Sequence, residues 1–169
     1  MKIETLEHLL ADELRGIYSA ENQIMNALPA WAKSARSDDL HLALGGHLER
    51  TRAHARHLEE ICEDLHINSK GKKSLGMQGI IEEGKEVLQE GVEPEPMEAA
   101  LIAVVQRMEH YEIALYGTAR AHARQLGFIK IADDLGRIVN EEKLADRQLT
   151  ALAENRVNVQ AAMSKAYAN

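Results

Sequence analysis

The sequence predicts an all-α protein, folded as a four-helix bundle in which two antiparallel helical hairpins are joined by a long crossover carrying a short extra helix. Three observations predict this class. Apolar residues recur at helical spacing along four long segments, and these segments form an internal repeat of two helical pairs. Only 4% of the residues are aromatic, with a single Phe and a single Trp, so the core must be aliphatic, as is typical of helix packing.

The first hairpin is expected to consist of two helices with a very short connection. The first helix runs from Ile3 to Ala35, and Pro29 is expected to kink its last turns because the ring removes one hydrogen bond. Ser37 or Asp38 caps the second helix, which continues to His66. The connection is too short for any arrangement other than an antiparallel pair.

The crossover begins with a polar, glycine-containing loop over residues 68–74. A short helix is predicted from Met77 to Gln89, closed by Gly91, because its apolar residues alternate with charged ones at helical spacing. Pro94 and Pro96 then mark the start of the third long helix.

The second hairpin is predicted to be as tight as the first. The third helix runs to Gln125, and Gly127 separates it from a fourth helix that ends near Asn155. The predicted domain therefore covers residues 1–155, followed by a C-terminal tail over residues 156–169. Two similar hairpins with a middle connection of about 30 residues are typical of the ferritin-like arrangement.

The internal repeat places acidic residues where a dry core is expected. When residues 14–28 are laid over residues 105–119, Glu21 meets Glu112 on the apolar seam of both helices. The second and fourth helices carry matching heptad ladders, which are Leu44, Thr51, Leu58, Leu65 and Phe128, Leu135, Glu142, Leu149. All four helices therefore turn polar at mid-length.

A buried carboxylate is strongly disfavoured unless it is paired or bound to a metal. No Lys or Arg occupies a core position in the middle layers of these helices, so a metal site is the simplest interpretation. Carboxylate and imidazole ligands suit Fe, Mn or Zn, and no thiolate joins them. The candidate ligands are Glu21, His54, Glu112 and Glu142, with Glu109 and His47 able to lean in.

An alternative without metal also fits these positions. The carboxyl groups can be protonated, with raised pKa values, and hydrogen-bonded by hydroxyl groups. His54 fits a hydrogen-bonded core histidine as well as a ligand, and for His47 the core interpretation is favoured. The available hydroxyl donors are Tyr18, Thr51, Tyr111 and Tyr116.

The amino-acid composition limits the kinds of binding partner and the cellular compartment that we expect. The formal net charge is −7, without a basic patch or tail that could follow a phosphate backbone, which argues against nucleic acid. No apolar run reaches the length of about 18 residues that a membrane span needs. Cys62 is the single cysteine, so no internal disulfide can form. Together with the absence of a leader pattern, this predicts a cytoplasmic protein.

Four phrases of the chain carry a family resemblance, namely residues 18–23, 47–51, 109–117 and 141–143. Through them the sequence resembles the YciE/YciF ferritin-like proteins of bacteria over nearly its whole length. The resemblance implies a rubrerythrin- or ferritin-like bundle that uses Fe or Mn, forms a homodimer and belongs to a bacterial stress response. It implies no particular reaction.

Two features depart from the pattern of these relatives. Family members often have a second glutamate where this chain has Arg50. A symmetric di-metal centre also needs Glu-x-x-His on two helices, whereas one helix here offers Thr51 with His54 and another offers Glu142 with Ala145. The number of bound ions, one or two, is therefore left open.

Three functions are compatible with this sequence. The leading hypothesis is a metal-binding stress-response protein that holds Fe or Mn and reacts with oxygen or peroxide. The second is a non-catalytic dimeric helical module with a degenerate site, which binds a stress-related protein. Iron storage in a closed shell is the weakest, because the sequence shows no assembly surface for a cage.

Overall fold

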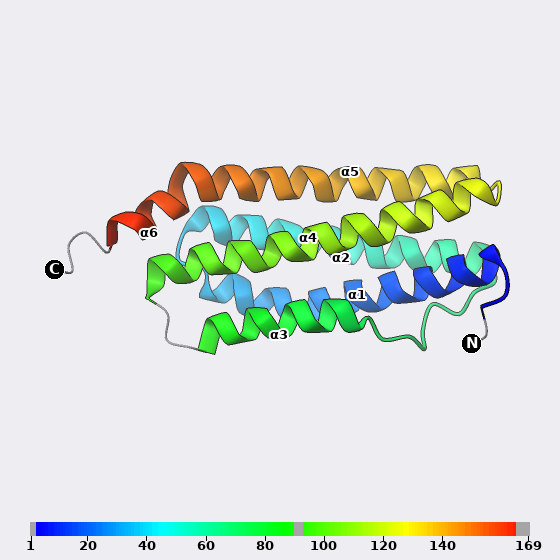
Figure 1. The fold of residues 1–169 in the computed structure, drawn as a ribbon, viewed down its shortest axis with the longest axis horizontal. Helices are drawn as coiled ribbons and strands as arrows, with labels where there is room; N and C mark the ends of the chain where they lie inside the picture. The colour runs from blue at the N-terminus through cyan, green and yellow to red at the C-terminus, as the bar shows by residue number, and fades with distance from the viewer. Residues whose placement is uncertain (1–2, 90–92, 165–169) are drawn as a thin grey trace.

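The computed structural model describes residues 3–89 and 93–164, and within these ranges the chain is helical without any strand. The elements are α1 (Leu6–Ser34), α2 (Asp38–Asp64), α3 (Leu75–Gln89), α4 (Pro94–Gln125), α5 (Ile129–Leu152), η1 (Ala153–Val157) and α6 (Asn158–Ser164). The helices α1, α2, α4 and α5 run side by side along the long axis (Figure 1). No helix in the described ranges combines the length and apolar character that crossing a bilayer requires.

The first hairpin has the predicted form with shorter helices. The first helix begins at Leu6 rather than Ile3, because the Thr5 hydroxyl caps it by accepting a hydrogen bond from the His8 amide at 3.2 Å. Ser37 caps α2, as predicted. That helix ends at Asp64, two residues before the expected end at His66, whose positive φ of 54° leaves the helical region.

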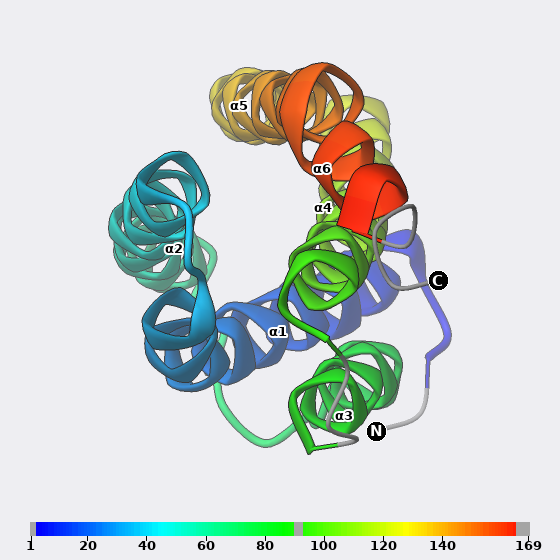
Figure 2. The same ribbon diagram turned by 90° about the vertical axis from the view of Figure 1, so that its left-hand side faces the viewer.

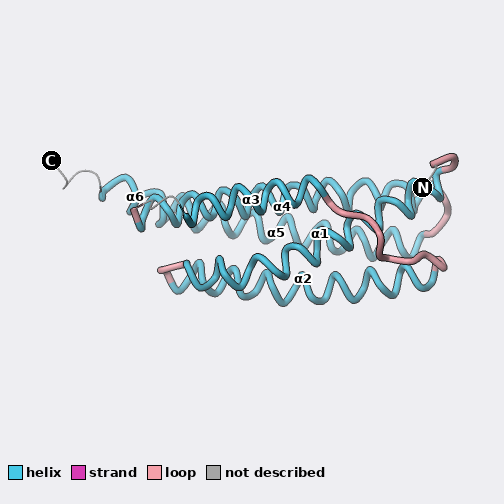
Figure 3. Tube along the Cα trace, turned by 90° about the horizontal axis from the view of Figure 1, so that it is seen from below, coloured by secondary structure: helices cyan, strands magenta, loops and turns pink. Residues whose placement is uncertain are grey.

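The short helix α3 packs against α1 and α4, on the outside of the long helices (Figure 2). It starts two residues before the predicted Met77, and its expected closure at Gly91 lies outside the described residues. Close approach to α1 depends on Gly84, because a Cβ atom there would lie 2.9 Å from Cη2 of Trp31. The tube view shows α3 alongside the long helices (Figure 3).

The C-terminal part differs from the prediction. The third long helix has the expected bounds, but the fourth ends at Leu152 and passes into the π-helical turn η1. The helix α6 follows to Ser164, so most of the predicted tail is helical. Val157 is only 1% exposed and belongs to the core. Weak apolar periodicity did not reveal this continuation, because the wide turn shifts the buried face.

The apolar core is divided into two clusters, one toward each end of the long helices. One cluster includes Ile24, Leu28, Trp31, Leu44, Val105 and Leu149, and the other includes Leu14, Ile17, Leu58, Tyr116 and Leu135. Apart from Glu98 near the start of α4, the buried acidic and histidine side chains of the long helices lie at mid-length, where the two clusters meet. The fold therefore encloses a polar layer at mid-length, between two dry layers.

Candidate metal centre

The polar layer contains all six side chains that the sequence singled out. Each of them is at most 4% exposed, and they come from all four long helices. They are Glu21 on α1, His47 and His54 on α2, Glu109 and Glu112 on α4, and Glu142 on α5. No lysine or arginine in the described ranges is buried. The burial of Glu21, His54, Glu112 and Glu142 agrees with their core positions in the heptad register, while the role of all six residues as ligands stays a prediction.

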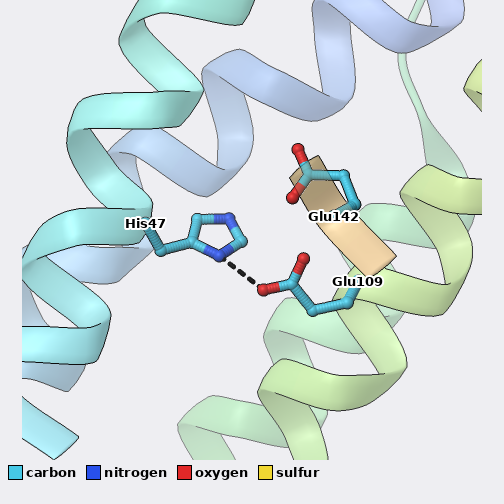
Figure 4. Close-up of side chains that lie close together, drawn as sticks. All are labelled: His47, Glu109 and Glu142. Atoms are coloured by element: carbon cyan, nitrogen blue, oxygen red, sulfur yellow. Dashed lines mark hydrogen bonds and ion pairs between the residues drawn. The ribbon is translucent and has the colours of Figure 1, made fainter. Parts of the chain in front are cut away.

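His47, Glu109 and Glu142 form one group within this layer. The three side chains point toward one another from α2, α4 and α5 (Figure 4). His47 Nδ1 lies 2.7 Å from Glu109 Oε1 in a hydrogen bond. One nitrogen or oxygen atom of each residue lies within 4.8 Å of the others. Imidazole and carboxylate donors at this spacing fit the ligand set of a divalent transition metal.

His54 lies in a second group, which shares Glu142 with the first. Its Nδ1 atom lies 3.0 Å from Glu142 Oε1 and 3.6 Å from Glu21 Oε1, but neither contact has the alignment of a hydrogen bond. Its Nε2 atom pairs with Glu141 Oε2 at 2.8 Å. Tyr116 donates a hydrogen bond to Glu21 Oε1. Glu142 therefore contacts both groups.

Glu112 is the least satisfied member of the layer. Neither of its carboxyl oxygens has a hydrogen-bond partner among the described residues. The nearest opposite group is His47 Nε2, 3.7 Å from Glu112 Oε2. Buried polar atoms are normally paired, so Glu112 is a position at which a bound cation would supply the missing partner.

The unpaired carboxyl oxygens of the layer show whether its residues suit a bound metal ion. One oxygen each of Glu21, Glu109 and Glu142 also lacks a hydrogen-bond partner among the described residues. Four buried carboxyl groups with free oxygens and two histidines match the hard and borderline donors that Fe and Mn bind. The residues present therefore fit a metal centre.

Only one of the four hydroxyl groups makes the hydrogen bond to a buried carboxyl group that the metal-free alternative requires. Tyr116 bonds to Glu21, as that alternative requires. The other three bond elsewhere: Tyr18 donates to the outer Glu59, Tyr111 contacts Ser74, and Thr51 donates to the carbonyl of His47. None of these four hydroxyls is hydrogen-bonded to Glu109, Glu112 or Glu142.

Burial raises the pKa of three of the four carboxyl groups. Removal from water raises the pKa of Glu109 to about 7, raises that of Glu21, and raises that of Glu112 well above its ordinary value. Burial acts in the same direction on Glu142, but His54 and His47 outweigh it and lower the pKa of this group. The layer therefore holds protons near neutral pH when no metal neutralises it.

The two histidines are held in the charged form by their carboxylate neighbours. Burial alone would lower the pKa of His54, but Glu142 and Glu21 outweigh it and raise the value to about 10. For His47, burial again acts downward, and the hydrogen bond with Glu109 reverses the direction and raises the pKa. A divalent ion at this layer would have to displace these protons.

The free energy of unfolding of the metal-free protein should fall as pH rises from about 5 to about 9. A group whose pKa is raised in the folded state stabilises below its unfolded value and loses that effect as pH rises through the folded value. For Glu109 this window runs from 4.5 to about 7, and for His54 from 6.5 to about 10. Glu142, with a lowered pKa, acts below 4.5 and outside this range.

Thermal melts of chelator-treated protein across this pH range measure the effect, expected on the order of a few kcal/mol. Glu109→Gln should flatten the lower half of the curve and His54→Gln the upper half. A melting temperature that stays level or rises with pH in the chelator-treated parent protein would contradict the raised pKa values of Glu109 and His54.

Sequence reasoning did not single out Glu141 as part of the site. Its side chain is more exposed than the six and reaches His54 from outside the layer. Its position directly beside Glu142 was a signal that could have found it, because a neighbouring residue on a helix can contact the outer side of the same partner.

Comparisons with known proteins agree with this architecture. Residues 5–162 match the family model described as a domain of unknown function, DUF892. The chain is 39% identical to the protein YciF of Escherichia coli strain K12 over 162 residues, covering 95% of this chain and 98% of that protein. The crystal structure of the E. coli stress protein YciF superposes with a TM-score of 0.88, covering 92% and 99% of the two chains at 39% identity.

Two further solved structures are similar. YcfI of Rhodopseudomonas palustris, described as a putative structural protein, superposes with a TM-score of 0.85 at 38% identity, covering 88% of this chain and 95% of that one. A protein from Xanthomonas campestris shares the fold, with a TM-score of 0.77 at 20% identity and coverage of 95% and 99%. On the match to the family model and to YciF, the chain belongs to the DUF892 family of YciF-like proteins.

Proposed function

We propose that this protein is a ferritin-like stress-response protein that binds one or two Fe or Mn ions in the polar layer of a four-helix bundle. The observation that carries the proposal is the convergence of four buried carboxyl groups whose free oxygens have no hydrogen-bond partner among the described residues. Its setting in a stress response rests on the relationship to the E. coli stress protein. The ferritin-like connection of the two hairpins is part of the same proposal.

The ligands divide into two groups around a shared residue. His47, Glu109 and Glu142 would hold one ion, since their donor atoms already lie close together. His54 and Glu21 would hold a neighbouring ion, with Glu142 as a ligand shared between the two. Glu112, which faces His47, is available to either. Bound Fe or Mn would supply one-electron chemistry toward oxygen or peroxide.

Metal content tests the proposal directly. Protein purified without chelator and supplied with Fe²⁺ or Mn²⁺ should retain about one to two ions per chain by plasma emission spectrometry, because the ligands of this layer are compatible with one or two sites. Glu142→Gln, which weakens both groups, should lose most of the metal. Content near zero in the parent protein would overturn the proposal.

Glu98→Gln is the matched control for this substitution. Glu98 is also buried, at 6% exposure, but it lies outside the polar layer and accepts hydrogen bonds from the amides of Arg36 and Ser37. Its neutral variant should keep the parental metal content. Equal loss in both variants would point to damaged folding rather than to lost ligands.

A second candidate function is a non-catalytic helical module that binds a stress-related protein. The specific observation in its favour is that His47 and His54 already pair with Glu109, Glu141 and Glu142, so part of the layer is neutralised from within. This candidate predicts that added metal leaves the thermal stability unchanged.

We also propose a cytoplasmic homodimer without a nucleic-acid or membrane partner. The acidic net charge of −7 supports the exclusion of nucleic acid. Sedimentation equilibrium distinguishes the dimer from the monomer and from the closed shell that an iron store would form.

A further inference from the structure

A cavity opens beside the polar layer, between α2, α4 and α5. Its volume is about 380 Å³, within the range of small-molecule pockets. Its lining includes the apolar side chains of Leu44, Val105 and Leu149. The polar lining residues are Asp39, His47, Arg50, Glu109 and Gln148. The cavity therefore joins an apolar chamber to the proposed metal ligands.

Arg50 supplies the positive charge of this cavity. It lines the cavity one helical turn after His47, and its Nη1 atom lies alongside Gly46, where a Cβ atom would be 3.6 Å away. Its Nε atom is buried, yet it has no hydrogen-bond partner among the described residues. The side chain as a whole is partly exposed, but a buried N–H donor without an acceptor is unusual, because such groups are normally paired.

The neighbouring carboxylates do not serve as this acceptor. Arg50 forms no ion pair with any described glutamate, although its charge lies near enough to Glu112 and His47 to oppose, without reversing, the upward shifts of their pKa values. Two divalent ions would balance the four buried carboxylates and leave Arg50 as an unmatched positive charge. The acceptor that is missing is then a monoanion.

We propose that this cavity binds a small monocarboxylate, with Arg50 holding the carboxylate and the apolar walls holding a short alkyl chain. A planar guanidinium matches a carboxylate through two parallel hydrogen bonds. A dianionic phosphate fits less well, because Arg50 is the single arginine or lysine lining this cavity and Glu109 lies beside it. The expectation that bound metal increases the affinity for the monocarboxylate rests on the proposed function.

Titration of butyrate, followed calorimetrically at constant ionic strength, tests this site. Parent protein should bind butyrate, more tightly when loaded with Mn²⁺ than after chelator treatment, because unneutralised carboxylates repel an anion. Arg50→Gln should lower the affinity about tenfold or more, the usual effect of losing a charged hydrogen bond. Arg50→Lys, which keeps the charge and loses the paired geometry, should fall between the two.

The control variant is Arg52→Gln on the same helix. Arg52 is exposed and pairs with Glu49 on the outer surface, so its loss should leave butyrate binding unchanged. Butyramide, which has the same shape without charge, should not bind. Binding of butyramide or inorganic phosphate as tightly as butyrate, or a parental affinity in Arg50→Gln, would overturn the proposal.

The two metal states separate this inference from the proposed function. If the metal centre is absent, emission spectrometry finds no metal and the two titrations coincide, and the Arg50 variants still decide whether the anion site exists. If the anion site is absent, butyrate binds in neither state while metal content is unaffected. Circular dichroism of each variant confirms that the helices are intact.

Discussion

Addition of Mn²⁺ at about 100 times its dissociation constant is expected to raise the melting temperature of the chelator-treated protein by roughly 5–11 °C. A ligand that binds only the folded state at this excess contributes about 2.7 kcal/mol, and a domain of this size shifts by about 2–4 °C per kcal/mol. The gain arises because the ion neutralises carboxyl groups that burial otherwise forces to hold protons. Differential scanning calorimetry measures it.

The response should depend on the residues of the polar layer. Glu109→Gln retains a hydrogen-bond acceptor for His47 but removes a charged ligand, and its shift should fall to less than about half that of the parent protein. Glu98→Gln, the buried control outside the layer, should shift as much as the parent. An unchanged melting temperature in the parent protein would favour the non-catalytic module.

Glu112→Leu is expected to stabilise the metal-free protein by about 1–3 kcal/mol, the usual cost of a buried polar group without partners. Both oxygens of Glu112 are unpaired among the described residues, and burial raises its pKa well above the ordinary value. Leucine has a similar volume and needs no partner. The same variant should lose part of its response to Mn²⁺, so stability and binding move in opposite directions.

His54→Leu is the contrasting variant. This histidine faces Glu21, Glu141 and Glu142, so its removal leaves buried carboxyl groups uncompensated, at a cost of about 3–5 kcal/mol. Urea unfolding of both variants after chelator treatment gives the two free energies. If Glu112→Leu destabilised as strongly as His54→Leu, Glu112 would have a structural partner, and the argument for a free ligand position would fail.

The helices and the polar layer could be predicted from the sequence because both depend on periodicity. A glutamate at a heptad core position must face the neighbouring helices once the helices form, so Glu21, Glu112 and Glu142 were placed by spacing alone. The bounds of α4 followed from Pro94, which favours the start of a helix, and from Gly127, whose positive φ ends one.

The partners within the layer could not be predicted in the same way. Whether His54 turns toward Glu21, Glu141 or Glu142 depends on side-chain rotamers and on the spacing between helices, neither of which leaves a pattern in the sequence. For the same reason Tyr116 could not be separated from Tyr18 and Tyr111 as a donor to the carboxyl groups.

The π-helical turn at Ala153–Val157 has a consequence for comparison with relatives. A wide turn of this kind accommodates one residue more than an α-helical turn, and its first and last residues, Ala153 and Val157, are both buried. It is equivalent to a single-residue insertion in an otherwise regular helix. Relatives with an unbroken last helix should therefore align with a gap of one residue at this place.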